Sequence, residues 1–128
     1  MRERIRDRGR LEDIIDYSNN VTKLIEGFSL EDFEADIRTY YAVMKNIEII
    51  GEAAYMLTRE FRERHTDLPW SQIVSMRHHI VHGYYQVDES IVWDVIQEDL
   101  ELLKQQVEAI LAETDWREWE EEKTEKTI

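Results

Sequence analysis

The chain has 128 residues, 42% of them hydrophobic, and a formal net charge of −13 at pH 7. This length suits one domain with its own core, and a composition with one proline, four glycines and no long apolar run favours long helices over a membrane-spanning protein. Because there is no cysteine, disulfides, thiol catalysis and cysteine-based zinc sites are excluded, and we expect a soluble, cytoplasmic protein.

The charge is uneven along the chain. Residues 1–10 contain five alternating arginines and have a net charge of +3, whereas residues 113–128 have a net charge of −4 and residues 11–112 one of −12. We interpret these segments as a basic N-terminal arm, a charged C-terminal tail and a helical domain, respectively. The arm either frays in solvent, because cations oppose the dipole at a helix N-terminus, or collects RNA phosphates. The tail is expected to fray, although Trp116 and Trp119 could dock.

The acidic domain limits the partners that the chain can hold. A net charge of −12 repels nucleic acid at long range, so any RNA contact must be local. The charge argues against a high-affinity nucleic-acid binder, but it is compatible with an enzyme that acts on one phosphodiester.

The first half of the chain predicts two helices. Hydrophobic residues recur every three or four positions from Leu11 onwards, which indicates an amphipathic helix that ends near Gly27. Ser29 is an expected N-cap with Asp32 three residues later, close to a capping box. From there the pattern predicts one helix to about Arg64, roughly 30 residues or about 45 Å long.

The second half predicts two more helices. Pro69 suits the first turn of a helix that runs from about Trp70 to His82, with Gly83 ending it. Asp88 is an expected N-cap for a fourth helix, whose hydrophobic face continues to the start of the tail. The sequence therefore predicts an all-α, antiparallel four-helix bundle.

The exit of the third predicted helix carries the most unusual segment, Arg77-His78-His79-Ile80-Val81-His82-Gly83-Tyr84-Tyr85. It combines a guanidinium, up to three imidazoles and two phenols, which can bind phosphate, move protons and accept a modification. Arg77 and His82 are five residues apart, so an ideal helix places them about 140° apart. They could still converge if the chain leaves the helix at His82, which Gly83 would allow, or if a two-fold dimer brings two helix ends together.

An imidazole beside a fixed guanidinium suits metal-free RNA cleavage. The 2′-hydroxyl attacks its own phosphodiester, a base removes its proton, an acid protonates the leaving oxygen and a cation stabilises the phosphorane. A metal is the alternative, since His78 and His82 have the i,i+4 spacing of helical metal ligands. However, the motif contains no acid and Arg77 would repel a cation, so we expect neither metal nor cofactor.

The pattern of Arg77, His78 and His82 within a helical bundle resembles the motif of the HEPN superfamily, and His82-Gly83-Tyr84 resembles the His-x-Tyr form of the HepT-like toxins. The resemblance covers roughly residues 10–112. Its further matches are Lys45-Asn46-Ile47-Glu48-Ile49-Ile50-Gly51-Glu52-Ala53, Pro69-Trp70 and Val87-Asp88 followed by Val92-Trp93. The sequence departs from the family at His78, where asparagine is more usual.

The resemblance implies a homodimeric, metal-independent endoribonuclease toxin, with Arg77 and His82 of both protomers lining the cleft. It also implies an antitoxin similar to the minimal nucleotidyltransferase MntA, which adds AMP to Tyr84 and so blocks RNA by bulk and like charge. His78 would be an auxiliary residue or lie at the surface, and the same choice holds for Glu52, which could orient Arg77. His79 is expected at the dimer interface or the surface.

A different class of function stays open. The chain could be a non-catalytic, nucleotide- or partner-binding subunit of a minimal nucleotidyltransferase complex. The acidic domain favours this alternative, because a net charge of −12 suits a basic partner better than it suits RNA.

Overall fold

A computed structural model of the protein describes the backbone of residues 3–83 and 88–122, and the side chains of residues 3–76 and 88–122. Every regular element in this part of the chain is a helix, so the all-α prediction is confirmed. The elements are η1 (Arg4–Arg6), α1 (Asp7–Leu24), α2 (Leu30–Ala35), α3 (Ile37–Met56), α4 (Arg59–Arg64), α5 (Trp70–Gly83), α6 (Glu89–Asp94), η3 (Val95–Leu100), α7 (Glu101–Glu113) and α8 (Trp116–Glu121).

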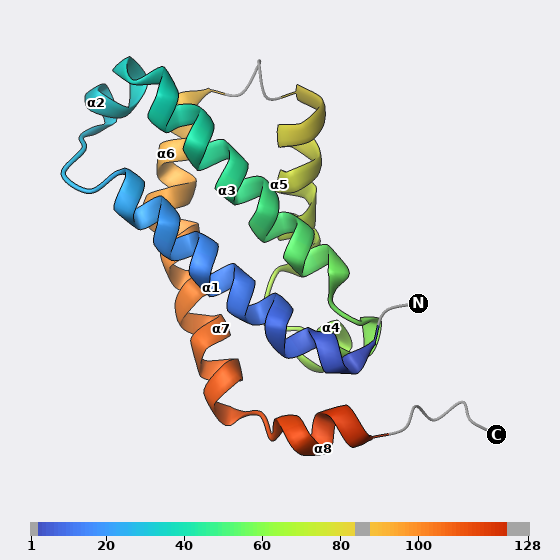
Figure 1. Ribbon diagram of the computed structural model, residues 1–128. Coiled ribbons are helices and arrows are strands. Elements are labelled where there is room, and N and C mark those ends of the chain that lie inside the picture. Colours follow the sequence, from blue (N-terminus) through green and yellow to red (C-terminus); the bar gives the residue numbers. More distant parts are fainter. Residues whose placement is uncertain (1–2, 84–87, 123–128) are drawn as a thin grey trace.

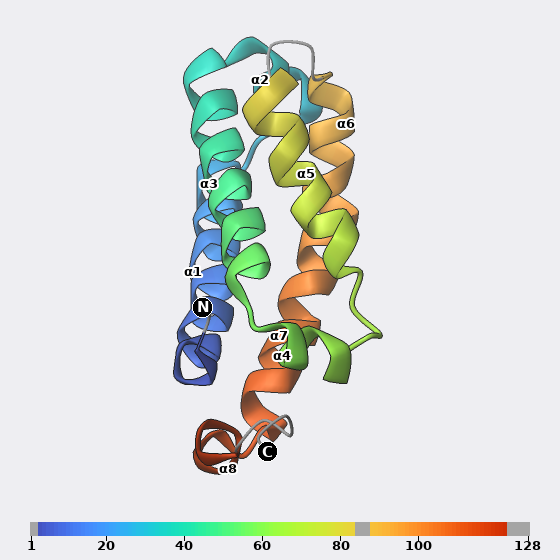
Figure 2. The ribbon, with the colours of Figure 1, turned by 90° about the vertical axis from the view of Figure 1, so that its right-hand side faces the viewer.

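Four long segments form the body of the molecule: α1, α3, α5 and the continuous run of α6, η3 and α7. Successive segments run in opposite directions along the bundle (Figures 1 and 2). Helix α3 packs against both α1 and α5, and α1 also packs against α7. The short helix α2 lies beside α6 at one end of the bundle, whereas α4 and α8 lie at the other end. The predicted antiparallel four-helix bundle is therefore confirmed.

The core follows the periodicity of the sequence. In α1 the buried positions recur at three and four residues and include Leu11, Ile14 and Val21, which are fully buried. The same spacing on the other segments brings one hydrophobic stripe from each helix to a common core. In the ranges 3–83 and 88–122, no helix combines the length and the apolar composition needed to cross a bilayer.

The two predicted N-caps are confirmed. Ser29 and Asp32 form the full capping box, in which the Asp32 amide donates to Ser29 Oγ at 3.2 Å and the Ser29 amide donates to Asp32 Oδ2 at 3.0 Å. Asp88 caps α6 by accepting a hydrogen bond from the Ser90 amide at 2.7 Å. The hydrogen bond from the Ser90 hydroxyl, followed by that from its amide, lowers the pKa of Asp88. Helix α6 therefore starts at a capping residue a short distance after the motif segment.

The single helix predicted from Ser29 to Arg64 is wrong, because the structure breaks it into α2, α3 and α4. Asp36 is extended and caps α3 by accepting hydrogen bonds from the amides of Arg38 and Thr39. Thr58 is also extended and caps α4. A side chain that accepts hydrogen bonds from nearby amides can end one helix and start the next. Because the hydrophobic pattern continues across such a break, the pattern alone does not reveal it.

The fourth predicted helix is confirmed as one continuous run, but its middle is π-helical. Segment η3 (Val95–Leu100) joins α6 to α7 through residues with ordinary right-handed helical angles. A π-helical turn widens the helix locally and is often found near functional sites. Here it carries side chains that line a groove beside α5, described below.

Both ends of the chain join one cluster at the α4 end of the bundle. Asp7 is buried, and its carboxyl group accepts hydrogen bonds from Thr58 N at 2.8 Å, Thr58 Oγ1 at 2.7 Å and Trp119 Nε1 at 3.0 Å. Phe61 stacks on Trp116 with ring centroids 5.9 Å apart, and it meets the edge of Trp119 at 5.4 Å. We call these five residues the terminal cluster.

Arginines cover the exposed side of this cluster. The Arg4 guanidinium carbon lies 4.0 Å from the centre of the Trp119 ring and that of Arg64 lies 4.8 Å from it. Glu122 binds both arginines, and the hydrogen bond from Arg64 lowers its pKa. The fraying that charge alone predicted for the arm and the tail is therefore wrong for the described residues of η1, α1 and α8.

Candidate active site

Helix α5 carries the predicted motif. It begins after Pro69 and extends through Gly83, so the backbone positions of Arg77 and His82 lie on its last turns. The side chains of Arg77, His78, His79 and His82, and the whole of Tyr84, lie outside the described residues. Because both positions 77 and 82 belong to the helix, its regular geometry separates them by about 140° around the axis.

Helix α3 packs along α5 and carries Glu52, the predicted acidic auxiliary residue (Figure 1). Glu52 is half-buried on α3 and follows Gly51, which is buried. A glycine at a buried helical position allows a neighbouring helix to approach closely. Whether Glu52 orients Arg77 stays a prediction, since the side chain of Arg77 is outside the described residues.

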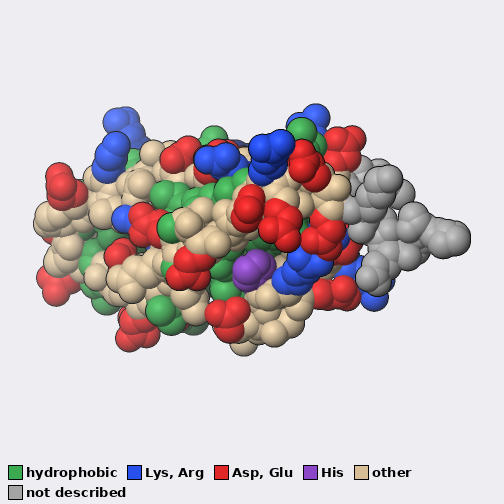
Figure 3. Space-filling model, turned by 90° about the horizontal axis from the view of Figure 1, so that it is seen from below, with side chains coloured by type: hydrophobic (Ala, Val, Ile, Leu, Met, Phe, Trp, Pro, Cys, Tyr) green, Lys and Arg blue, Asp and Glu red, His purple; other side chains and the backbone are tan. Residues whose placement is uncertain are grey.

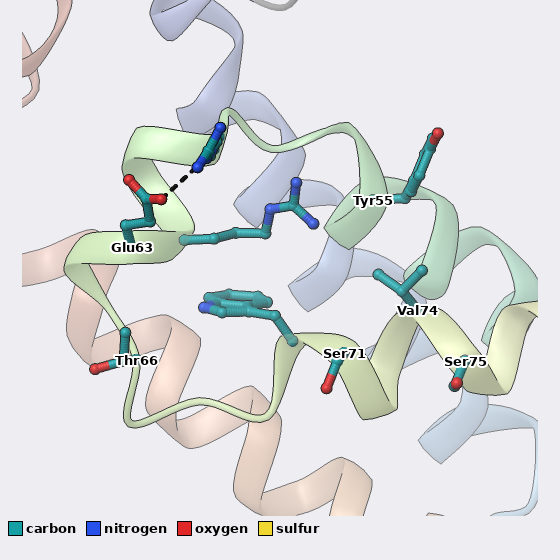
Figure 4. Close-up of a pocket in the computed structure, with 9 residues that line it drawn as sticks. Tyr55, Glu63, Thr66, Ser71, Val74 and Ser75 are labelled. Carbon is teal, nitrogen blue, oxygen red and sulfur yellow. Dashed lines mark hydrogen bonds and ion pairs between the residues drawn. The ribbon is translucent and has the colours of Figure 1, made fainter.

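A cavity of about 630 Å³ lies between α4 and the first half of α5. Figure 4 shows Ser71 and Ser75 on α5, Glu63 across the cavity on α4, and Thr66 on the connecting loop. Arg59, Arg62, Tyr55, Trp70 and Val74 complete the lining. We call this space the α4–α5 cavity.

The surface of the α4–α5 cavity is mainly apolar, but its lining also includes two arginines and one glutamate. Arg59 Nε donates to Glu63 Oε2 at 3.0 Å, and both side chains are well exposed. Arg62 is half-buried and its guanidinium makes no hydrogen bond or ion pair with any residue that the structure describes. Trp70 is buried and donates from Nε1 to the backbone oxygen of His65 at 2.9 Å, which fixes the indole beside the cavity.

A groove of about 340 Å³ lies on the other side of α5, toward η3 and α7. Its floor is apolar and includes Ile73 and Met76, the residue before Arg77. Asp67 and Asp99 contribute acidic groups, and Leu102 of α7 is 55% exposed at its side. The groove, called here the α5–α7 groove, therefore joins an apolar floor to an acidic rim.

The end of the bundle that holds α4 and α8 mixes both signs of charge. Figure 3 shows acidic and basic side chains interleaved over this end, with hydrophobic side chains between them. Ion pairs spaced by four residues, such as Arg59 with Glu63 and Arg117 with Glu121, account for part of the pattern. Such exposed pairs contribute little to stability, and they leave few unpaired cations for a ligand.

Sequence reasoning located the motif but missed the α4–α5 cavity. The available signal was the alternation of charge in Arg59-Glu60-Phe61-Arg62-Glu63-Arg64, which was interpreted only as the end of a long helix. In the described part of the chain no three histidine or acidic side chains are placed to hold a metal ion. His78 and His82, the pair considered as metal ligands, lie outside that part.

Comparison with known proteins decides the family. The profile of the family described as "Ribonuclease HepT-like" matches residues 14–110. The chain belongs to the HepT-like family. This confirms the resemblance drawn from the motif around Arg77 and His82, and it places the chain in a family of ribonucleases with the all-α HEPN fold.

Several curated relatives of this HepT-like protein cover most of its length. A candidate RNase of Caldanaerobacter subterraneus subsp. tengcongensis is 38% identical over 101 residues, which is 79% of this chain and 90% of the relative. The "Probable ribonuclease HepT" of Thermococcus cleftensis is 33% identical over 100 residues, covering 78% of this chain and 91% of the relative. A candidate RNase of Methanocaldococcus jannaschii is 31% identical over 100 residues, covering 78% and 92%. No solved structure gives a significant match.

Proposed function

We propose that this HepT-like protein is a metal-independent endoribonuclease and the toxin of a toxin–antitoxin pair. The observation that carries the proposal is the motif on the last turns of α5 in a chain that belongs to a ribonuclease family. Arg77 and His82 are the proposed catalytic residues, with His78 and Glu52 as auxiliary residues.

A second copy of the chain would allow Arg77 and His82 to act on the same phosphate. Positions 77 and 82 are about 140° apart on α5, so one regular helix does not direct both side chains at the same phosphate. In a two-fold dimer with the ends of two α5 helices facing each other, Arg77 of one protomer approaches His82 of the other. We therefore propose a homodimer with the cleft between the protomers.

The chemistry needs only these groups and the RNA itself. One His82 imidazole accepts the proton of the 2′-hydroxyl, whose oxygen attacks the adjacent phosphorus. The Arg77 guanidinium stabilises the charge of the phosphorane. The imidazolium of the other His82 protonates the 5′-oxygen as its bond to phosphorus breaks, which leaves a 2′,3′-cyclic phosphate and a 5′-hydroxyl.

Cleavage of RNA by the purified protein in the presence of a chelator tests this proposal. We expect fragments that end in a 2′,3′-cyclic phosphate, formed at the same rate with and without the chelator, because no step uses a metal. End-group analysis by mass spectrometry measures the product. Activity that requires an added divalent ion would contradict the metal-free mechanism and favour His78 and His82 as metal ligands.

We further propose that a nucleotidyltransferase antitoxin similar to MntA inactivates the protein by adding AMP to Tyr84. The adenylate would place bulk and negative charge next to the cleft and so exclude RNA. Co-expression with the nucleotidyltransferase should increase the intact mass by one or more AMP groups, and Tyr84→Phe should abolish the increase. Tyr85→Phe is the matched control and should keep it; the reverse result would move the modified residue to Tyr85.

A second candidate function is a non-catalytic, nucleotide- or partner-binding subunit of a nucleotidyltransferase complex. The α5–α7 groove favours it, because an apolar floor with Asp67 and Asp99 suits an amphipathic, basic segment of a partner. Growth arrest on expression of this chain alone, relieved by the partner, supports the toxin. No arrest and no cleavage, together with a stable complex, supports the binding subunit.

A further inference from the structure

Arg62 is a half-buried cation with no counter-charge among the described residues. Its neighbours on α4 differ, since Arg59 binds Glu63 and Arg64 binds Glu122. An unpaired guanidinium gains from an anion that accepts its hydrogen bonds, and its planar fork matches the oxygens of a phosphate. The position of Arg62 on the α4–α5 cavity therefore indicates a site for an anion.

The rest of the α4–α5 cavity is mainly apolar, but it also carries hydroxyls that suit a sugar-phosphate backbone. Its volume of about 630 Å³ is in the range of ligand pockets and far exceeds that of a single small ion. The hydroxyls of Thr66, Ser71 and Ser75 can donate to phosphate or sugar oxygens. The indole N–H of Trp70 is already used by the backbone, so its ring offers apolar surface only.

Charge distinguishes this cavity from the α5–α7 groove. The α4–α5 cavity is lined by Arg59, Arg62 and Glu63, a net charge of +1. The α5–α7 groove carries Asp67 and Asp99 with no cation. Because the chain as a whole has a net charge of −13, a polyanion is held best where cations outnumber acids.

The register of α5 connects the cavity to the motif. Ser71 and Ser75 are exposed, and helical positions 78 and 82 continue the same stripe at spacings of three and four residues. Position 82 follows Ser75 by about 10 Å along the helix axis. Figure 2 shows α5 running from the α4 end of the bundle to the end where α2 lies. A single-stranded nucleic acid that is bound in the cavity could therefore extend along α5 to the motif.

We propose that the α4–α5 cavity binds a backbone phosphate of single-stranded RNA that extends from the cleft, with Arg62 as its main ligand. Arg59 is the second ligand and exchanges Glu63 for the phosphate when RNA binds. The description of the RNA as substrate rests on the proposed function, whereas the binding itself does not.

Binding of a fluorescent, single-stranded 2′-O-methyl RNA tests the proposal with the full chain. Its blocked 2′-oxygen prevents cleavage, so the wild-type protein can be used. We expect Arg62→Gln to weaken binding roughly tenfold at low salt, as for the loss of one charge-assisted hydrogen bond. The slope of log Kd against log salt should fall by about 0.7, the value for one phosphate contact on a single strand. Arg62→Lys should retain most of this slope.

Arg117→Gln is the matched control. Arg117 is exposed on α8 and paired with Glu121, so its loss changes the net charge by the same amount without touching the cavity. An equal loss of RNA affinity in both variants would mean that only the net charge of the protein matters, and this result would overturn the proposal. Unchanged binding by Arg62→Gln would also overturn it, and so would displacement of the RNA by AMP at constant ionic strength, which indicates a free-nucleotide site.

Failure of this inference and failure of the proposed function give different results. If wild type and Arg62→Gln cleave RNA equally well and with the same KM, the cavity does not bind the RNA, and the proposed ribonuclease function is unaffected. If Arg62→Gln loses RNA binding but the wild-type protein never cleaves RNA, the binding site in the cavity is supported and the ribonuclease function is rejected.

Discussion

Replacement of Arg77 or His82 by alanine is expected to reduce RNA cleavage by at least about a thousandfold. A positioned general acid or base contributes about 10²–10⁴-fold to a rate, and loss of a cation that stabilises a charged transition state has an effect of similar size. Because the single cleft of the proposed dimer uses Arg77 and His82 of both protomers, either change alone is sufficient. Initial rates on a fluorogenic RNA measure the effect.

Two controls separate catalysis from folding. His79→Ala removes an imidazole from the same helix, and it should keep most of the activity because His79 is expected at the interface or the surface. Urea unfolding of Arg77→Ala and His82→Ala should give free energies of unfolding within about 0.5 kcal/mol of wild type, as for surface substitutions. Cleavage by both variants at the wild-type rate would refute the catalytic assignment.

Replacement of Asp7 by alanine is expected to lower the free energy of unfolding by about 3 kcal/mol. Asp7 is 1% exposed and accepts three hydrogen bonds, from Thr58 N, Thr58 Oγ1 and Trp119 Nε1. Its removal leaves the amide and the indole N–H buried with no acceptor, and each such donor costs about 1–3 kcal/mol. Since these bonds share one carboxyl group, their effects do not simply add.

Urea unfolding at neutral pH measures the loss, with Asp16→Ala as the control. Asp16 is an exposed acid on the same helix, so its replacement should change stability by less than about 0.5 kcal/mol. Asp7→Asn keeps the size of the side chain but turns one acceptor into a donor, and it should fall between Asp7→Ala and wild type. Equal stability of Asp7→Ala and wild type would mean that the terminal cluster contributes nothing to the fold.

Most features that depend on neighbouring residues could be predicted from the sequence, with the two helix breaks at Asp36 and Thr58 as exceptions, whereas features that depend on distant residues could not. The buried stripe of α1, the capping box at Ser29 and the start of α5 after Pro69 are local, and they are confirmed. The breaks at Asp36 and Thr58 were missed, because capping side chains interrupt a helix without the glycine or proline that marks most helix ends.

The ends of the chain show the second limit. Alternating arginines and a glutamate-rich tail predict solvated segments, and only the folded structure brings Trp119 to Asp7 across the end of the bundle. The candidate site likewise has a part that could be predicted from the sequence and a part that could not. The positions of Arg77 and His82 follow from a short pattern, whereas the α4–α5 cavity combines side chains from α3, α4, the connecting loop and α5, so no single stretch of sequence contains it.

The hydrogen bond between Asp7 and Trp119 also has a consequence for folding during translation. These two residues are 112 positions apart, and translation at about 5–20 residues per second needs on the order of ten seconds to cover that interval. Throughout that time the carboxyl group of Asp7 has no indole partner, even if α1 and α3 have already paired. The terminal cluster can therefore be completed only after Trp119 has been synthesised, later than the pairing of α1 with α3.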